Sequence, residues 1–226
     1  MAAAREFYGR WATLYDYVAR GFPRVARVRR RAAAALELSP GDRVVELGCG
    51  TGANLPYLRE AVGPSGEVVG VDFTRPSLER ARQLVDRRGW ANVHLVQADA
   101  TRPPVAEVDA VLESFVLGML DDPAAVVDAW CDLAAGGTVV LVDAGPSRRS
   151  YGPLLNGPLR AFTTVSTPPT TKLRYEEDVL DRLDARLAAG HDALRRRAAA
   201  VAHEDHLLGM VRLTGGRLDG DPGEGS

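Results

Sequence analysis

The sequence predicts an α/β fold in which helices cover both faces of a doubly wound, mostly parallel sheet of seven strands. Between Arg43 and Asp143, short β-rich runs alternate with amphipathic helical patterns. Several of these runs are almost continuously apolar, as expected for parallel strands that are covered on both faces. Two later apolar segments, Ala199–Leu207 and Met210–Leu213, predict an antiparallel pair at the edge of the same sheet.

A helical cap is expected ahead of the sheet, at residues 1–40. Apolar and aromatic residues recur at helical spacing over residues 7–18, and Gly21-Phe22-Pro23 ends that helix. A second helix is predicted over Arg24–Leu38, with valine and alanine side chains on one face. Ser39–Asp42 then predicts a turn into the first strand.

The alternating region is expected to form a Rossmann-like core over residues 41–145, because right-handed crossovers wind such units into one sheet. Thr74 is expected to cap one helix, with Pro76 in the first turn, where an N–H is not needed. In this fold the ligand lies outside the carboxyl ends of the strands. Strands are predicted at Arg43–Leu47, Glu67–Val71, Val93–Gln97, Asp109–Leu112 and Thr138–Val142, and helices at Ala53–Val62, Arg75–Arg88 and Pro123–Leu133.

The rest of the chain is assigned to the substrate side of the same domain. Residues 146–214 begin with a loop rich in Pro, Thr and Gly and a short helix near Leu154–Phe162. A long helix is expected over Tyr175–Arg197, before the two closing strands. The Gly- and Asp-rich residues 215–226 predict a flexible tail.

The composition excludes several classes of protein. The 226 residues include 28 basic and 30 acidic side chains, which argues against an overall basic protein that binds nucleic acid and against a disordered acidic one. Cys49 and Cys131 lack the spacing of a disulfide framework or a metal site, so no metal is expected. No apolar run approaches the roughly 20 residues of a membrane-spanning helix. We therefore expect a soluble, cytoplasmic protein.

The strongest functional motif is a glycine-rich loop, Glu46-Leu47-Gly48-Cys49-Gly50-Thr51-Gly52-Ala53-Asn54, which follows a predicted strand and opens a helix. Its glycines allow a sharp turn and let a ligand approach main-chain N–H groups. Asp72 ends the next strand, 20 residues beyond Gly52, where a ribose diol could donate two hydrogen bonds to it. The pattern therefore predicts a ligand that contains a ribose.

Two ligands compete for this loop. Gly48, Gly50 and Ala53 satisfy the dinucleotide pattern G-x-G-x-x-A, which would indicate an NAD(P)-dependent oxidoreductase. However, Glu46 would repel a pyrophosphate, whereas it would attract the sulfonium and ammonium groups of S-adenosylmethionine (SAM). A Tyr-x-x-x-Lys pair is also absent, since Pro168 stands four residues before the single lysine, Lys172. The charges favour SAM.

The loop and the V-x-G-V-D run that ends at Asp72 resemble the first two motifs of class I SAM-dependent methyltransferases. The similarity continues through Val96–Ala100, Ser114-Phe115, Leu120–Pro123 and Leu133–Thr138, and covers about Tyr8–Asp143. It implies this fold, SAM as cofactor and methyl transfer as activity. A nucleic-acid substrate is not expected, because no N/D-P-P-Y/F tetrapeptide follows the fourth strand.

The resemblance also implies roles for individual residues. The methionine and ribose side would be lined from the loop, and Asp72 would hold the ribose hydroxyls. Asp72 and Asp99 each have an alternative role, as caps of the turns or helices that follow them. The implied cofactor-binding residues are Tyr15, Glu46, Gly48, Cys49, Gly50, Gly52, Asn54, Asp72, Phe73, Asp99, Ala100, Ser114 and Phe115.

The methyl acceptor is indicated by the N-terminal helix. Trp11-Ala12-Thr13-Leu14-Tyr15-Asp16 resembles the W-A-x-x-Y-D element of quinone and phospholipid methyltransferases, where the tyrosine helps to cover the cofactor. A small or lipid-soluble acceptor of the quinone or phospholipid type is therefore favoured. No spaced constellation identifies a general base, and His203-Glu204-Asp205-His206 is interpreted as solvated surface. The alternatives are an NAD(P)-dependent oxidoreductase and a SAM-binding protein without catalysis.

The charge distribution adds a second partner. Residues 20–31 contain six arginines and no acid, whereas the chain as a whole has a net charge of −2. A cationic helix of this kind can rest on anionic lipid headgroups, and its alternative is an ordinary solvated face. We expect peripheral contact with an anionic membrane through Arg20, Arg24, Arg27, Arg29, Arg30 and Arg31.

Overall fold

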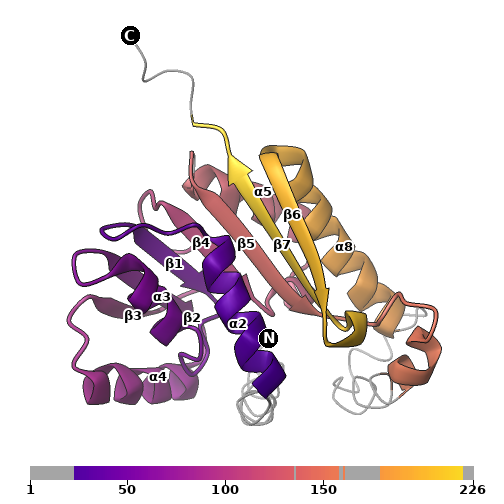
Figure 1. The fold of residues 1–226 in the computed structure, drawn as a ribbon, viewed down its shortest axis with the longest axis horizontal. Coiled ribbons are helices and arrows are strands. Elements are labelled where there is room, and N and C mark those ends of the chain that lie inside the picture. The colour runs from indigo at the N-terminus through magenta and orange to yellow at the C-terminus, as the bar shows by residue number, and fades with distance from the viewer. Residues whose placement is uncertain (1–22, 135, 158–159, 161–178, 221–226) are drawn as a thin grey trace.

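The computed structural model of the chain describes residues 23–134, 136–157, 160 and 179–220, and these residues form a seven-stranded sheet with helices on both faces (Figure 1). The strand order is β3-β2-β1-β4-β5-β7-β6. β1 to β5 run parallel, whereas β7 runs antiparallel to both of its neighbours, so the sheet is mixed. The strands are β1 (Arg43–Leu47), β2 (Glu67–Asp72), β3 (Val93–Gln97), β4 (Ala110–Ser114), β5 (Thr138–Ala144), β6 (Ala198–His206) and β7 (Val211–Leu218).

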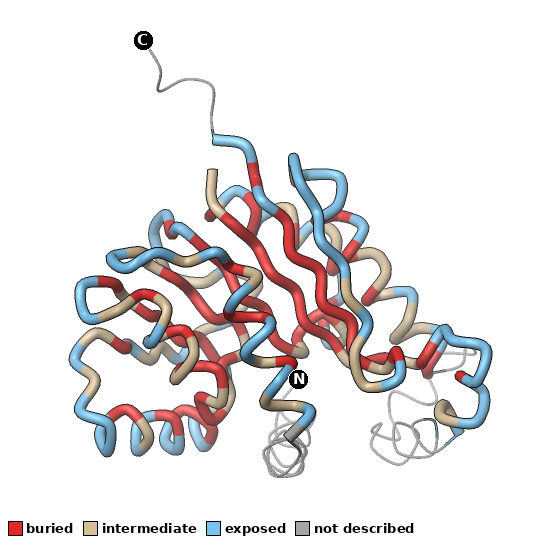
Figure 2. Tube along the Cα trace, viewed as in Figure 1, coloured by how far each residue is buried: buried red, intermediate tan, exposed pale blue. Residues whose placement is uncertain are grey.

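Two layers of helices bury the central strands of the sheet, which are red in Figure 2, whereas the edge strand β6 is largely exposed. One face packs against α2 (Pro23–Ala35), α3 (Leu55–Val62) and α4 (Arg75–Arg88) through one apolar cluster. The other face packs against α5 (Pro123–Leu133) and α8 (Val179–Arg197) through a second cluster around Trp130. Alternate residues of the central strands belong to different clusters, because successive side chains in a strand point to opposite faces.

The predicted rhythm of the core is confirmed in the described residues. The bounds of β1, β3, α4 and α5 are as predicted, and the remaining core elements differ by one or two residues at their ends. The predicted short helix near Leu154–Phe162 is present as far as it is described, at residues 152–157. The predicted helix over residues 7–18 and Tyr15 lie outside the described residues.

The predicted flexible tail begins too early. Gly215 and Gly216 belong to β7, which continues to Leu218 and pairs with both β5 and β6. A Cβ on Gly216 would lie 2.8 Å from Leu194 Cδ1, so glycine here permits the close approach of α8. Glycines that indicated a loop in the sequence are therefore packing positions in a strand.

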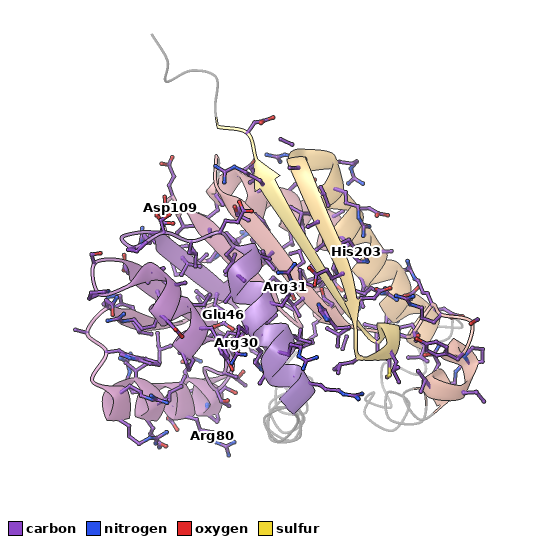
Figure 3. All side chains as sticks on the ribbon, viewed as in Figure 1. Arg30, Arg31, Glu46, Arg80, Asp109 and His203 are labelled. Atoms are coloured by element: carbon purple, nitrogen blue, oxygen red, sulfur yellow. The ribbon has the colours of Figure 1, made fainter. Side chains whose placement is uncertain are left out.

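The parallel strands bring their carboxyl ends to one edge of the sheet. Figure 3 shows Glu46 toward this edge and Asp109, which precedes β4, at the opposite one. The glycine-rich loop follows β1 directly, and α3 begins after Asn54. Ligands of doubly wound sheets lie outside this edge, so the fold brings the predicted site residues of the described chain together there.

Candidate active site

The glycine-rich loop turns sharply between β1 and α3. Gly48 has φ +77°, and a Cβ on it would lie 2.4 Å from Val116 Cγ2 and 3.1 Å from the Ser114 carbonyl oxygen. The Gly48 and Cys49 N–H groups both donate to the Val71 carbonyl, at 2.9 and 3.0 Å. The first glycine is therefore needed because the segment after β4 packs directly against it.

Gly50 marks the open side of the loop. It has φ +52°, and a Cβ built on it would meet no heavy atom within 4 Å. Its N–H donates to Asp72 Oδ2 at 2.9 Å, which ties the loop to the end of β2. Gly52 differs from Gly50, because a Cβ there would lie 2.7 Å from Leu55 Cδ1. Of these two glycines, Gly50 is thus the one whose missing side chain leaves free space.

Asn54 holds the buried carboxylate of Glu46. Its Nδ2 donates to Glu46 Oε1 at 2.6 Å and to Ser114 Oγ at 2.9 Å. Glu46 is only 1% exposed, and Asn54 and Ser114 are buried as well. A carboxylate at this edge favours a cationic ligand, because opposite charges attract.

Arg29 joins this group from α2 and was not predicted as a site residue. Its Nη1 donates to Asn54 Oδ1 at 3.1 Å, so the Asn54 amide contacts groups on α2, β1 and β4 at once. In the sequence, Arg29 is one of six arginines between residues 20 and 31, and nothing in the sequence distinguishes it from the other five. Helical spacing alone did not single it out.

The arginines of α2 differ in what they contact. Arg29 contacts Asn54, Arg31 donates to Glu204 of β6 at 2.6 and 2.8 Å, and Arg30 lies 5.9 Å from the centre of the Tyr57 ring. Arg24, Arg27, Arg30 and Arg31 are exposed, Arg29 is half-buried, and Arg20 lies outside the described residues. Arg29 and Arg31 have these partners because α2 packs across the sheet between α3 and β6.

Asp72 is both the end of β2 and a cap for the turn that follows. Oδ1 accepts from the Thr74 N–H at 2.7 Å and from the Thr74 hydroxyl, while Oδ2 accepts from Gly50. Thr74 occupies the N-cap position of α4 as predicted, but its side chain makes no capping bond. Because an ionised carboxylate has about four acceptor sites, Asp72 can accept further hydrogen bonds.

The residues expected beside an adenine lie in two neighbouring turns. Phe73 is exposed, and its carbonyl accepts from Gln97 Nε2 at 3.1 Å. Asp99 is exposed and its Oδ1 caps its own turn through the N–H and hydroxyl of Thr101, at 2.9 and 2.8 Å. The Ala100 carbonyl accepts from Trp130 Nε1 at 2.8 Å. This hydrogen bond fixes the main chain of Ala100 to α5.

The segment after β4 is held by a second buried carboxylate, Glu113, which was not among the predicted site residues. Phe115 adopts φ +61°, an unusual conformation for a bulky residue. Glu113 Oε1 accepts from the N–H groups of Val116 and Leu117, and Oε2 accepts from Val142 at 3.3 Å. Burial and then the neighbouring Asp143 hold the pKa of Glu113 well above its usual range. A charged residue within an apolar run was the available signal.

Cys49 turns away from the open side of the loop. It is buried, and a Cβ on Gly70 of β2 would lie 3.0 Å from its Sγ. Burial, followed by Glu46 and Asp72, raises the pKa of the thiol well above its usual range. The Cys49 side chain is therefore a neutral packing group.

Comparisons with known proteins identify the family. A family model described as a methyltransferase domain matches residues 44–137. The phosphatidylethanolamine N-methyltransferase of Cereibacter sphaeroides is 35% identical over 156 residues, which cover 67% of this chain and 72% of that protein. This chain belongs to the SAM-dependent methyltransferases.

Further relatives of this methyltransferase carry other names. The demethylmenaquinone methyltransferase of Anoxybacillus flavithermus is 33% identical over 125 residues, which cover 54% of this chain and 53% of that protein. The chain therefore matches about half the length of several of its relatives.

Solved structures agree with the fold. A SAM-dependent O-methyltransferase from Thermotoga maritima has a TM-score of 0.59 at 16% identity and covers 90% of this chain and 68% of that one. A SAM-dependent methyltransferase from Aquifex aeolicus has a TM-score of 0.55 at 18% identity, over 83% and 88% of the two chains. At these identities the likeness concerns the fold alone.

The described residues fit SAM as the cofactor of this methyltransferase. Glu46 provides a buried negative charge for a cationic ligand, and Gly50 leaves open space on the adjoining side of the loop. Asp72 retains acceptor capacity beside that space. A pyrophosphate would meet the Glu46 carboxylate with the wrong sign of charge. The expectation of SAM over NAD(P) is therefore confirmed by the family and is consistent with the charges of the site.

Proposed function

We propose that this methyltransferase transfers the SAM methyl group to a small or lipid-soluble acceptor, with a quinone or phospholipid type favoured. The observation that carries the acceptor class is the 35% identity to a phosphatidylethanolamine N-methyltransferase over 67% of the chain. The similarity to a demethylmenaquinone methyltransferase supports a quinone type as well. In neither relative does the match cover the whole protein, so the acceptor is assigned by class.

In this proposal the polar groups around Asn54 hold the methionine part of the cofactor. Glu46 contributes the negative charge for the ammonium group, and Asn54 keeps that carboxylate in place. Gly48, Gly50 and Gly52 give the loop its close approach, with the Cys49 main chain between them. Asp72 accepts from the ribose hydroxyls, and Phe73, Asp99 and Ala100 lie along the adenine.

Ser114 and Phe115 are proposed to line the floor of the site where the methyl group is transferred. When bound, SAM would supply an electrophilic methyl group on a sulfonium, which the acceptor attacks in line while S-adenosylhomocysteine leaves. The protein has to align the acceptor and exclude water. Ser114 Oγ already accepts from Asn54, so its position is fixed relative to Glu46. Tyr15, which lies outside the described residues, is proposed as a cover.

The experiment that tests this function is incubation of the protein with methyl-labelled SAM and fractionated cell extract. Label is expected in the lipid or small-molecule fraction, and label in protein or nucleic acid would contradict the proposal. A protein that binds S-adenosylhomocysteine but labels nothing would instead be a SAM-binding protein without catalysis. Calorimetry with S-adenosylhomocysteine and NADH is expected to detect binding of the adenosyl compound only.

Contact with an anionic membrane is proposed through the exposed arginines of α2. Arg24 and Arg27 are exposed, and among the described residues no helix has the length and apolar character to cross a bilayer. Vesicles that contain phosphatidylglycerol should bind the protein more weakly after Arg24→Gln and Arg27→Gln together. Vesicle binding that the double substitution leaves unchanged, or no binding by the parent protein, would refute this contact.

A further inference from the structure

A second polar site lies on the face of the sheet that α8 covers, between α8 and the antiparallel strands β6 and β7. A pocket of about 130 Å³ opens there, and we name it the α8–β6 pocket. A water molecule occupies about 30 Å³ in the liquid, so the pocket has room for a small polyatomic ion. Figure 3 shows His203 on β6 beside α8. The side chains that line the pocket include Arg148, Arg195, Arg212, His191, His203 and Asp205.

Arg212 lies buried beside this pocket. It is 5% exposed, and its Nη2 donates to Asp184 Oδ1 at 2.5 Å and to the Pro146 carbonyl at 2.8 Å. Its Nη1 is buried and has no hydrogen-bond partner among the described residues. Leaving a buried N–H of a charged group without an acceptor is unfavourable. An acceptor atom from a bound ligand would satisfy it.

Around the pocket four arginines pair with three carboxylates, and a fourth carboxylate, that of the buried Asp143, lies 3.3 Å from His191. Arg148 and Arg212 share a single carboxylate, Asp184. Arg195 pairs with Asp192 at 2.6 Å, and Arg149 pairs with Asp205 at 3.2 Å. Asp192 and Asp205 are thus each paired with one guanidinium, whereas Asp184 is paired with two.

The pocket chemistry favours an anion over a metal ion. No group of three His, Cys, Asp or Glu side chains within the described ranges is placed to hold a metal ion. Burial and the Arg195 guanidinium lower the pKa of His203, which is expected where the local potential is positive. Guanidinium groups are the side chains best suited to bind phosphate and carboxylate.

We propose that the α8–β6 pocket binds an oxyanion, a phosphate or a carboxylate, through Arg212 at its buried side and Arg148 and Arg195 at its rim. Arg212 is paired in register with Asp143 near the end of β5, so the pocket lies toward the same edge of the sheet as the glycine-rich loop. The oxyanion is either a group of the methyl acceptor, which rests on the proposed function, or a free ion.

Inorganic phosphate is the first probe. Phosphate, at constant ionic strength, should raise the melting temperature of the wild-type protein. Arg148→Gln combined with Arg195→Gln should remove at least nine tenths of this rise. Both side chains are substantially exposed, at 59% and 38%, so the double variant is expected to fold. Arg197→Gln is the matched control on α8, because Arg197 pairs with Asp132 away from the pocket and should keep the full response. No response in the wild type, or an equal response in the double variant, would overturn the proposal.

A second arm identifies the source of the oxyanion. Short-chain phosphatidic acid below its micellar concentration is compared with the matching neutral diacylglycerol and with phosphate. If phosphatidic acid binds at least tenfold more tightly than phosphate, and the double variant loses this binding, the pocket is assigned to a lipid-like acceptor. If phosphatidic acid and phosphate bind with equal affinity, the pocket is assigned to a free ion. Affinity for S-adenosylhomocysteine is measured on every variant. If S-adenosylhomocysteine binds normally but no anion binds, only the proposal for the pocket is refuted. If anions bind but no methyl group is transferred, the proposed function is refuted.

Discussion

Arg29 of α2 donates from Nη1 to Asn54 Oδ1 across 3.1 Å, and so connects the N-terminal helical region to the residue that opens α3. The same amide donates to the Glu46 carboxylate, which we propose contacts the cofactor. A helix that approaches the loop from outside the sheet therefore orients a group inside the proposed SAM site.

Replacing Arg29 with Ala is expected to weaken S-adenosylhomocysteine binding by about tenfold, or about 1.4 kcal/mol, because Asn54 loses one of its three anchors. Calorimetry measures this effect. Arg27→Ala is the control, since Arg27 lies two residues away on the same helix and is exposed. Equal affinities for the two variants would show that Arg29 does not support the cofactor site.

The two glycines Gly48 and Gly50 should respond differently to Ala. Both have positive φ, which costs about 1 kcal/mol for a residue with a Cβ. Only at Gly48 would the added Cβ collide, with Val116 Cγ2 at 2.4 Å. Gly48→Ala should therefore lower the free energy of unfolding by a further ~1–3 kcal/mol.

Gly50→Ala should instead leave stability within about 1 kcal/mol of the parent and weaken cofactor binding, because its Cβ enters the open space beside the loop. Urea unfolding and calorimetry on both variants separate the two effects. If Gly50→Ala bound S-adenosylhomocysteine as tightly as the parent, the cofactor would not occupy that space.

Asp72→Ala is expected to affect stability and binding together. It removes the acceptor for the Gly50 and Thr74 N–H groups as well as the proposed contact with the ribose. S-adenosylhomocysteine binding should weaken by about 1–3 kcal/mol, and the melting temperature should fall. Thr74→Val is the comparison, since it removes only the hydroxyl that donates to Asp72. A lower melting temperature with unchanged affinity would mean that Asp72 is only a cap.

The sequence was sufficient for the core because its strands are short apolar runs and its helices have clear ends. The positions of the glycine-rich loop and Asp72 were predictable as well, because the loop directly follows one of these strands and Asp72 ends another. Arg29 and Glu113 were not predictable in this way, because their partners come from other elements: Asn54 is 25 positions from Arg29, and Val142 is 29 positions from Glu113. The assignment of Gly215 and Gly216 to a flexible tail was wrong for a similar reason, since the packing of α8 rather than local propensity places them in β7.

Glu113 should make stability depend on pH with a definite sign. Burial and then Asp143 raise the pKa of Glu113 well above its ordinary 4.5, so the folded protein holds this proton more tightly than the unfolded chain does. The free energy of unfolding should therefore fall as pH rises from about 4.5 toward the higher pKa of the folded state. Glu113→Gln removes this titration, because the amide cannot lose a proton. The parent should lose stability relative to Glu113→Gln as pH rises, as measured by urea unfolding at about pH 5 and about pH 8.

Glu113→Ala provides the contrast, because it leaves the N–H groups of Val116, Leu117 and Val142 without their side-chain acceptor. It should lower the free energy of unfolding by about 3 kcal/mol at both pH values. Since the same carboxylate fixes the segment that contains Phe115, Glu113→Ala should also slow methyl transfer more than it weakens S-adenosylhomocysteine binding. A parent and a Gln variant with the same pH dependence would show that Glu113 is ionised in both the folded and the unfolded states.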